Sequence, residues 1–205
     1  MIVPTMSKEE VVKEMLSDFD LVMRKSRYEI KALRRFFLKT KKYPFVKAYD
    51  YVTPKTKNNW IYFIEAKTKD DIFQVFINYH YTSIGLMAAL VHTDKTIVFY
   101  TSHFFTRFIE REKLDISKPQ DMIKKYFILN YVSSFEIQNN PSGKADEFIG
   151  RVNTGVVLGV RTKNKIMVCN TYLSNDMLHK DQTLIVSNLK ADVDNYQLML
   201  DTGLI

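Results

Sequence analysis

Cysteine is almost missing from this sequence of 205 residues, since Cys169 is the only one. A disulfide framework within the chain and a zinc site built on cysteine pairs are therefore excluded. Glycine and proline are scarce as well, with six and five residues, so long linkers or disordered tails are not expected to occupy much of the chain. No apolar run comes near the length of about 18 residues that a membrane-spanning helix needs, and we expect no membrane partner.

Motifs for metal or cofactor binding are also missing. The four histidines are His80, His92, His103 and His179, and no two of them have the spacing of a zinc-binding helix. Gly155 and its neighbouring glycines are not followed by the lysine and hydroxyl residue of a phosphate-binding loop, and fit close backbone contacts in a strand pair. The first residues do not resemble the apolar region of a secretory leader. We therefore expect a cytoplasmic protein that uses neither a metal nor a cofactor.

Positive charge is what the sequence has in excess, with a formal net charge of +7. Much of the excess lies between residues 24 and 42, where Glu29 is the only acidic residue. A basic helix of this kind favours polyanionic partners, above all nucleic acid such as RNA. The candidate nucleic-acid-binding residues are Arg24, Lys31, Arg34, Arg35 and Lys39. The alternative is that these residues are simply the solvated face of the helix.

The spacing of the apolar residues predicts that the N-terminal part of the chain is helical. Ser7–Glu10 forms a capping box ahead of apolar residues at helical spacing. A second helical pattern runs through the basic stretch until Pro44, because proline disfavours helix in the residue before it. We therefore predict an N-terminal helical pair, which forms an extension over residues 1–43.

The apolar period changes to two between Phe45 and Thr101, which predicts consecutive antiparallel strands. Residues 84–91 of this part fit either a strand or a buried helix. Near residue 78, the polar residues Gln74, Asn78 and His80 alternate with apolar ones. This alternation predicts a strand with one wet face.

An amphipathic helix is predicted at residues 102–112. Thr101 or Ser102 can cap its start. The side that suits packing on a sheet is formed by Phe104, Phe105, Phe108 and Ile109. The opposite side groups His103, Arg107, Glu110 and Arg111.

The rest of the chain is predicted to contain a helix, two strands and a last helix. Ser117–Gln120 has the pattern of a second capping box. The loop pattern at Gln138–Gly143 separates this helical part from strands at residues 155–160 and 166–172. Helical spacing returns from Met177.

These elements predict an α+β fold. It combines the N-terminal helical pair with a largely antiparallel sheet, on which the helix at residues 102–112 packs. Residues 44–205 are expected to form the α+β domain. One compact unit is the first choice, and two small lobes are the alternative.

The polar side of the helix at residues 102–112 carries groups that RNA cleavage without a metal requires. One group removes the proton of a ribose 2′-hydroxyl, another protonates the leaving oxygen, and cations stabilise the phosphorane. His103 suits proton transfer because the pKa of imidazole lies near neutrality. Arg107 and Arg111 can bind phosphate oxygens in a bidentate manner, and Glu110 would orient or assist. The alternative is a solvated face on which arginine and glutamate pair within the helix.

A resemblance to a known family rests on this helix and on the last predicted strands. The residues that carry it, within residues 95–174, are His103, Arg107, Glu110, Arg111, Thr171 and Tyr172. The pattern resembles the small bacterial ribonuclease toxins of the RelE and barnase-like superfamily, and is similar to uncharacterised relatives with an "H…R..ER" helix ahead of a small sheet. The resemblance implies a catalytic site in which the helix residues act together with the hydroxyl group of Thr171 or Tyr172. RNA would be the substrate, and a protein antitoxin or a second copy of the chain a further partner.

Two functions follow as hypotheses. The first is a metal-independent RNA-cleaving protein of the toxin or phage-defence kind, with His103 as general acid or base. The second is a non-enzymatic nucleic-acid-binding protein, for example an accessory protein of a mobile element, which uses the basic stretch. Only the first expects that His103→Ala abolishes cleavage while binding persists.

Overall fold

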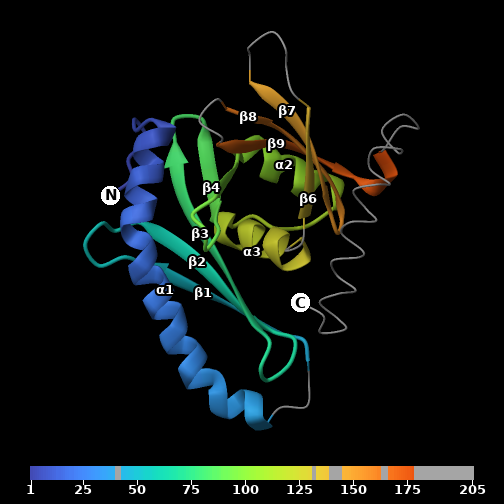
Figure 1. Ribbon diagram of the computed structural model, residues 1–205. Helices are drawn as coiled ribbons and strands as arrows, with labels where there is room; N and C mark the ends of the chain where they lie inside the picture. Colours follow the sequence, from blue (N-terminus) through green and yellow to red (C-terminus); the bar gives the residue numbers. More distant parts are fainter. Residues whose placement is uncertain (40–42, 131–132, 139–144, 163–165, 178–205) are drawn as a thin grey trace. The chain divides into compact units, whose positions relative to one another are not determined.

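The α+β fold predicted from the sequence is confirmed (Figure 1). The computed structural model describes residues 1–39, 43–130, 133–138, 145–162 and 166–177. The chain divides into two compact units, residues 1–97 and 98–205.

The first unit begins with one long helix. α1 spans Lys8–Lys39 without a break, which corrects the predicted helical pair. No glycine or proline interrupts these residues, so one helix contains both apolar patterns. The predicted capping box is confirmed: the amide of Glu10 donates to Ser7 Oγ at 3.2 Å, and the amide of Ser7 donates to Glu10 Oε2 at 2.7 Å. α1 contacts the strand that begins at residue 59. The division into an extension over residues 1–43 and a domain over residues 44–205 stays a prediction.

Four antiparallel strands complete the first unit, and each pairs with the next. They are β1 (Phe45–Val52), β2 (Asn59–Ala66), β3 (Ile72–Thr82) and β4 (Gly85–Val91). This meander confirms the prediction of consecutive strands, and it shows that the ambiguous residues 84–91 form a strand. Figure 1 shows α1 running along the meander.

The polar face of β3 is covered rather than wet, which corrects the sequence prediction. Phe76 on this face contacts Phe19 of α1, with ring centroids 5.2 Å apart. Asn78 is fully buried, and its side-chain amide donates to the carbonyl of Asn59 at 3.0 Å. His80 is 6% exposed, and its Nδ1 lies 3.2 Å from Asn78 Oδ1. Polar residues can occupy this face because other groups of the protein satisfy their hydrogen bonds.

The stability of the protein is expected to fall in acid because of His80. Burial lowers the pKa of His80 to about 4. The unfolded chain has the ordinary value of about 6.5, so it takes up the proton first as the pH falls. The stabilising contribution of neutral His80 is therefore complete above about pH 6.5 and is lost between there and about pH 4, with a loss on the order of 3 kcal/mol. Urea unfolding of the wild type and of His80→Gln across this range measures it. Identical pH profiles of the two proteins would contradict the expectation.

The second unit contains five described strands, and the first of them begins at the boundary between the two units. The strands are β5 (Ile97–Tyr100), β6 (Ser133–Gln138), β7 (Asp146–Val152), β8 (Gly155–Arg161) and β9 (Met167–Ser174). They lie in the order β5-β9-β8-β7-β6. β5 pairs with β9 in parallel, and the other pairs are antiparallel.

β6 and β7 were not predicted, although β8 and β9 were. They flank residues 139–143, so the loop pattern lies between two strands and does not directly follow a helix. The loop residues themselves lie outside the described residues. β6 reads Ser-Ser-Phe-Glu-Ile-Gln, and its two apolar residues are too few to give a clear period of two.

Helices α2 (Ser102–Arg111) and α3 (Pro119–Leu129) follow β5. α2 is confirmed, and it packs on β9 as predicted. The prediction of a second capping box is wrong, because the N-cap of α3 is Lys118, whose side chain makes no capping hydrogen bond. A short 3₁₀ turn (Asn175–Met177) ends the described part, and the predicted last helix lies outside it.

Candidate nucleic-acid interface

Local hydrogen bonding determines where α2 begins. Thr101 is extended and forms the N-cap, and its hydroxyl oxygen accepts a hydrogen bond from the amide of Phe104 at 3.2 Å. The first turn therefore places Phe104 on the buried side and His103 on the exposed side. This division confirms the two faces predicted for the helix.

The predicted site residues on the polar side of α2 differ in their exposure and in their hydrogen-bond partners. His103 is exposed. Arg107 Nη1 pairs with Glu110 Oε2 at 2.9 Å, and both side chains are about half exposed. Nη1 of Arg111 is buried and has no hydrogen-bond partner among the described residues. The Arg107–Glu110 pair is the i, i+3 arrangement typical of a solvated helix face.

Tyr172 lies on the opposite, apolar side of α2. Its ring is fully buried and contacts the rings of Phe104 and Phe108, with centroids 6.1 and 5.3 Å away. Gly155 permits this packing, since a methyl group there would lie 2.6 Å from the Tyr172 hydroxyl oxygen. The structure therefore does not bring the Tyr172 hydroxyl together with His103.

Thr171 is also separated from the polar side of α2. It is the cross-strand partner of Leu158, so the two side chains share one face of the sheet. Leu158 packs against the buried residues Ile149 and Val156. Thr171 neighbours Tyr172 in β9 and lies on the other face, which does not carry α2. The predicted convergence of His103, Arg107 and Thr171 is therefore not present in this arrangement.

The Tyr172 hydroxyl belongs to a polar network that sequence reasoning missed. It donates to Glu112 Oε1 at 2.5 Å and lies 2.8 Å from the hydroxyl of Thr154. The amide of Thr154 donates to Asn130 Oδ1 at 2.9 Å, and Asn130 Nδ2 donates to the carbonyl of Tyr126 at 3.2 Å. Burial, together with the bond to Glu112, raises the pKa of Tyr172. No local pattern could reveal this network, because its members are far apart in the sequence.

Tyr172→Phe is expected to destabilise the protein by about 1–3 kcal/mol, because it leaves the carboxylate of Glu112 without its buried donor. Chemical unfolding measures the change. Tyr81→Phe is the matched control, since Tyr81 is exposed and should change the free energy of unfolding by less than about 0.5 kcal/mol. Equal effects of the two substitutions would contradict the role assigned to the network.

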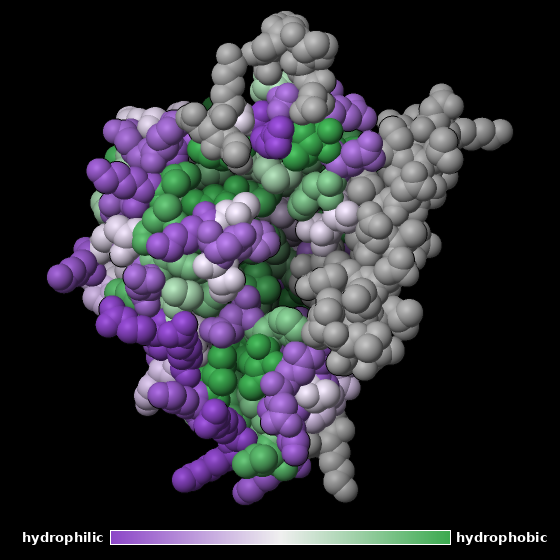
Figure 2. Space-filling model, viewed as in Figure 1, coloured by the Kyte–Doolittle hydropathy of each residue, from purple (hydrophilic) through white to green (hydrophobic). Residues whose placement is uncertain are grey.

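Exposed cations line one side of the second half of α1. The members, which we call the basic stripe, are Arg24, Lys31, Arg35 and Lys39. Helical geometry places them within about 80° of one another and over a length of about 22 Å. Figure 2 shows strongly hydrophilic residues along the lower left of the molecule, where this half of α1 runs. Arg34, the remaining predicted residue, is exposed next to the stripe.

The part of α1 that carries the basic stripe is poor in acidic residues. Glu29 is the only acidic residue of α1 after Asp20, and its carboxylate accepts a hydrogen bond from Lys25 at 2.6 Å. Tyr28 is 66% exposed, and Lys25 Nζ lies 5.2 Å from the centroid of its ring. Phe36 is also exposed. Cations interleaved with exposed aromatic rings can contact both the phosphates and the bases of a nucleic acid.

Other kinds of site receive no support from the described residues. No three His, Cys, Asp or Glu side chains among them are placed to hold a metal ion. Cys169 is buried, and burial raises the pKa of its thiol, which does not suit a nucleophile. None of the helices in this part of the chain combines the length and the apolar character needed to cross a membrane.

No protein-family model, curated protein or solved structure matches this chain. The resemblance of residues 95–174 to ribonuclease toxins therefore stays a prediction. The function has to be inferred from the predicted site residues of α1 and α2.

Proposed function

We propose that this protein binds nucleic acid through the basic stripe of α1. The observation that carries the proposal is the exposure of Arg24, Lys31, Arg35 and Lys39 on one side of α1, whose only acidic residue after Asp20 is Glu29, which is hydrogen-bonded to Lys25. A straight row of cations about 22 Å long can meet several phosphates of one strand. Each such contact releases a condensed counterion, and this release supplies most of the binding free energy. A cytoplasmic location would give the stripe access to RNA.

Fluorescence anisotropy of a labelled RNA strand tests this function. The wild-type protein should bind the strand in low salt, and the affinity should fall steeply as salt is added, because counterions compete for the phosphates. The same titration with labelled DNA shows whether binding depends on the sugar. Absence of binding to both nucleic acids in low salt would contradict the proposal.

RNA cleavage without a metal is a second candidate function, located at α2. It is favoured by His103, an exposed imidazole in the first turn of a helix, with Arg107 one turn further along. The partial positive charge of a helix N-terminus favours a phosphate beside this imidazole. Thr171 and Tyr172 do not join this group, so only the residues of α2 would act on the RNA.

His103→Ala is expected to reduce cleavage about 100-fold or more if His103 transfers a proton, while RNA binding is unchanged. The assay measures cleavage of a labelled RNA in a buffer that contains EDTA. Thr106→Ala, which alters another exposed residue of α2, is the control and should cleave like the wild type. If the wild-type protein binds RNA but does not cleave it, RNA cleavage is contradicted and binding remains.

A further inference from the structure

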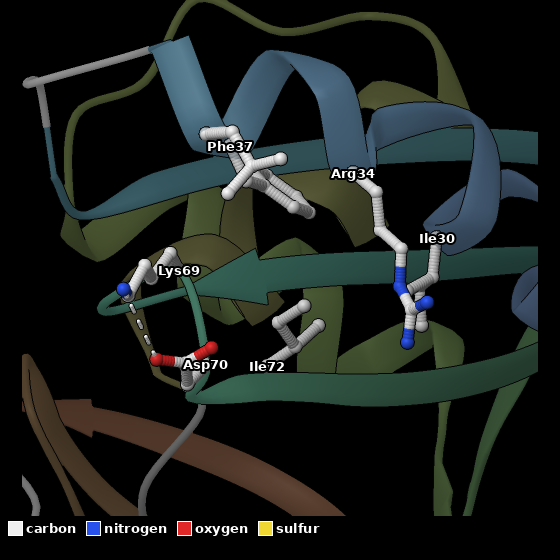
Figure 3. A pocket seen from close by; sticks show the side chains of 7 residues that line it. Ile30, Arg34, Phe37, Lys69, Asp70 and Ile72 are labelled. Carbon is white, nitrogen blue, oxygen red and sulfur yellow. Dashed lines mark ion pairs between the residues drawn. The ribbon is translucent and has the colours of Figure 1, made fainter.

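A cavity of about 370 Å³ lies beside the basic stripe, between the end of α1 and the turn from β2 to β3. The residues that line it are Ile30, Arg34, Phe37, Leu38, Lys69, Asp70 and Ile72. Figure 3 shows Arg34 and Phe37 extending from α1 towards the strands, and Ile72 on the strand that faces them. Its volume falls in the range of about 300–1,000 Å³ that is usual for small-molecule sites.

The lining of the cavity combines an apolar interior with a charged rim. Ile30, Ile72 and the buried ring of Phe37 form the apolar part. Lys69 Nζ and Asp70 Oδ2 lie 3.9 Å apart on the turn, and both side chains are largely exposed, so the pair is loose. The rim therefore offers a cationic donor and a carboxylate acceptor to a ligand, while the interior offers apolar contact.

Arg34 connects this cavity to the basic stripe. It lines the cavity, and it follows Lys31 by three residues and precedes Arg35 directly on the same helix. The cations of the stripe thus continue to the mouth of the cavity. This continuity favours a ligand with a row of negative charges over a small anion, which needs only one cation.

We propose that the cavity receives an unpaired base of a single-stranded nucleic acid whose phosphates lie along the basic stripe. A nucleobase is flat and has polar edges, which suits apolar walls, a guanidinium group and a rim with both a donor and an acceptor. A base in a duplex is stacked and paired, so it enters such a cavity only after unpairing. This inference rests on the proposed function and adds a preference for single strands.

The test fills the cavity without changing the charge of the protein. Ile72→Trp places a large side chain in the cavity, and Val52→Trp, at a residue of β1 that is 53% exposed, is the control. The probes are a labelled single-stranded RNA and DNA of mixed sequence, the DNA duplex, and a DNA strand of equal length without bases.

The wild type and Val52→Trp should bind the intact DNA strand about tenfold more tightly than the strand without bases. Ile72→Trp should lose this difference and retain its affinity for the duplex. Tighter binding of RNA than of DNA would indicate that the protein contacts the ribose in addition to the base.

The outcomes separate the cavity from the basic stripe. If the wild type binds the strands with and without bases equally, or if Ile72→Trp binds like the wild type, the cavity proposal is overturned and the stripe remains. If the wild type binds none of the probes, both proposals fail. Should Ile72→Trp not fold, Ile30→Phe fills the cavity from the helix side and decides the same question.

Discussion

Replacing the basic stripe with glutamine is expected to weaken nucleic-acid binding about 100-fold near physiological salt. The variant changes Arg24, Lys31, Arg35 and Lys39 together, and it leaves Arg34 at the cavity unchanged. The effect is large because each cation that meets a phosphate of a single strand contributes a salt exponent of about 0.7, and the losses multiply. Anisotropy titrations with labelled single-stranded RNA measure the change. All four residues are exposed, so the variant should fold like the wild type.

A charge-matched variant shows whether the position of the cations matters. It changes exposed lysines outside the stripe to glutamine, namely Lys8, Lys13, Lys55 and Lys118. Its net charge equals that of the stripe variant, but its affinity should stay within a few-fold of the wild type, since nearby charges dominate at physiological ionic strength. Equal losses in both variants would assign binding to net charge and contradict an interface on α1.

Asp18→Ala is expected to cost about 3 kcal/mol or more of folding stability. Asp18 is 5% exposed, and its carboxylate accepts hydrogen bonds from Asn58 Nδ2 at 2.7 Å and from Thr56 Oγ1 at 2.8 Å. Thr53 Oγ1 lies 3.3 Å away as a further donor. Bonds to a charged acceptor are worth about 1.5–3 kcal/mol each, and the substitution leaves buried donors unsatisfied. The carboxylate therefore attaches α1 to the connection between β1 and β2.

The control for Asp18 is Asp20→Ala, two residues along the same helix. Asp20 is exposed, so its removal should change the free energy of unfolding by less than about 0.5 kcal/mol. Urea unfolding of both variants gives the comparison. If Asp18→Ala were no less stable than Asp20→Ala, the carboxylate would not be what holds α1 in place.

Several features that depend on neighbouring residues were predicted correctly, although the second capping box at Ser117 was not. The capping box at Ser7 and the N-cap at Thr101, one of the two residues that could cap that helix, each need only groups a turn apart, and their three hydrogen bonds are present. The consecutive strands β1 to β3 follow from an apolar period of two and short polar turns, whereas the residues of β4 fitted either a strand or a helix. Gly155 and Gly159 do sit where the backbone of β9 approaches closely, as the sequence suggested.

Features that depend on distant residues were not predicted correctly. The join between the two helical patterns was misread although the reason is local: α1 continues because no glycine or proline between the patterns breaks it. Thr171 and Tyr172 were placed at one site with His103, but successive residues of a strand face opposite sides of the sheet. The partner of Tyr172 is Glu112, 60 residues away, and no spacing rule connects them. The exposure of the basic stripe agrees with the sequence, because charge and helical period determine it locally.

The salt dependence of the affinity tests binding through the basic stripe most directly. The measurement compares the wild type with the glutamine variant of Arg24, Lys31, Arg35 and Lys39 over a range of salt concentrations. A plot of log affinity against log salt should be steeper for the wild type by about 3 units of slope, which corresponds to the loss of the phosphate contacts made by these residues. Equal slopes for the two proteins would show that the stripe does not meet phosphates, and would contradict the proposed function.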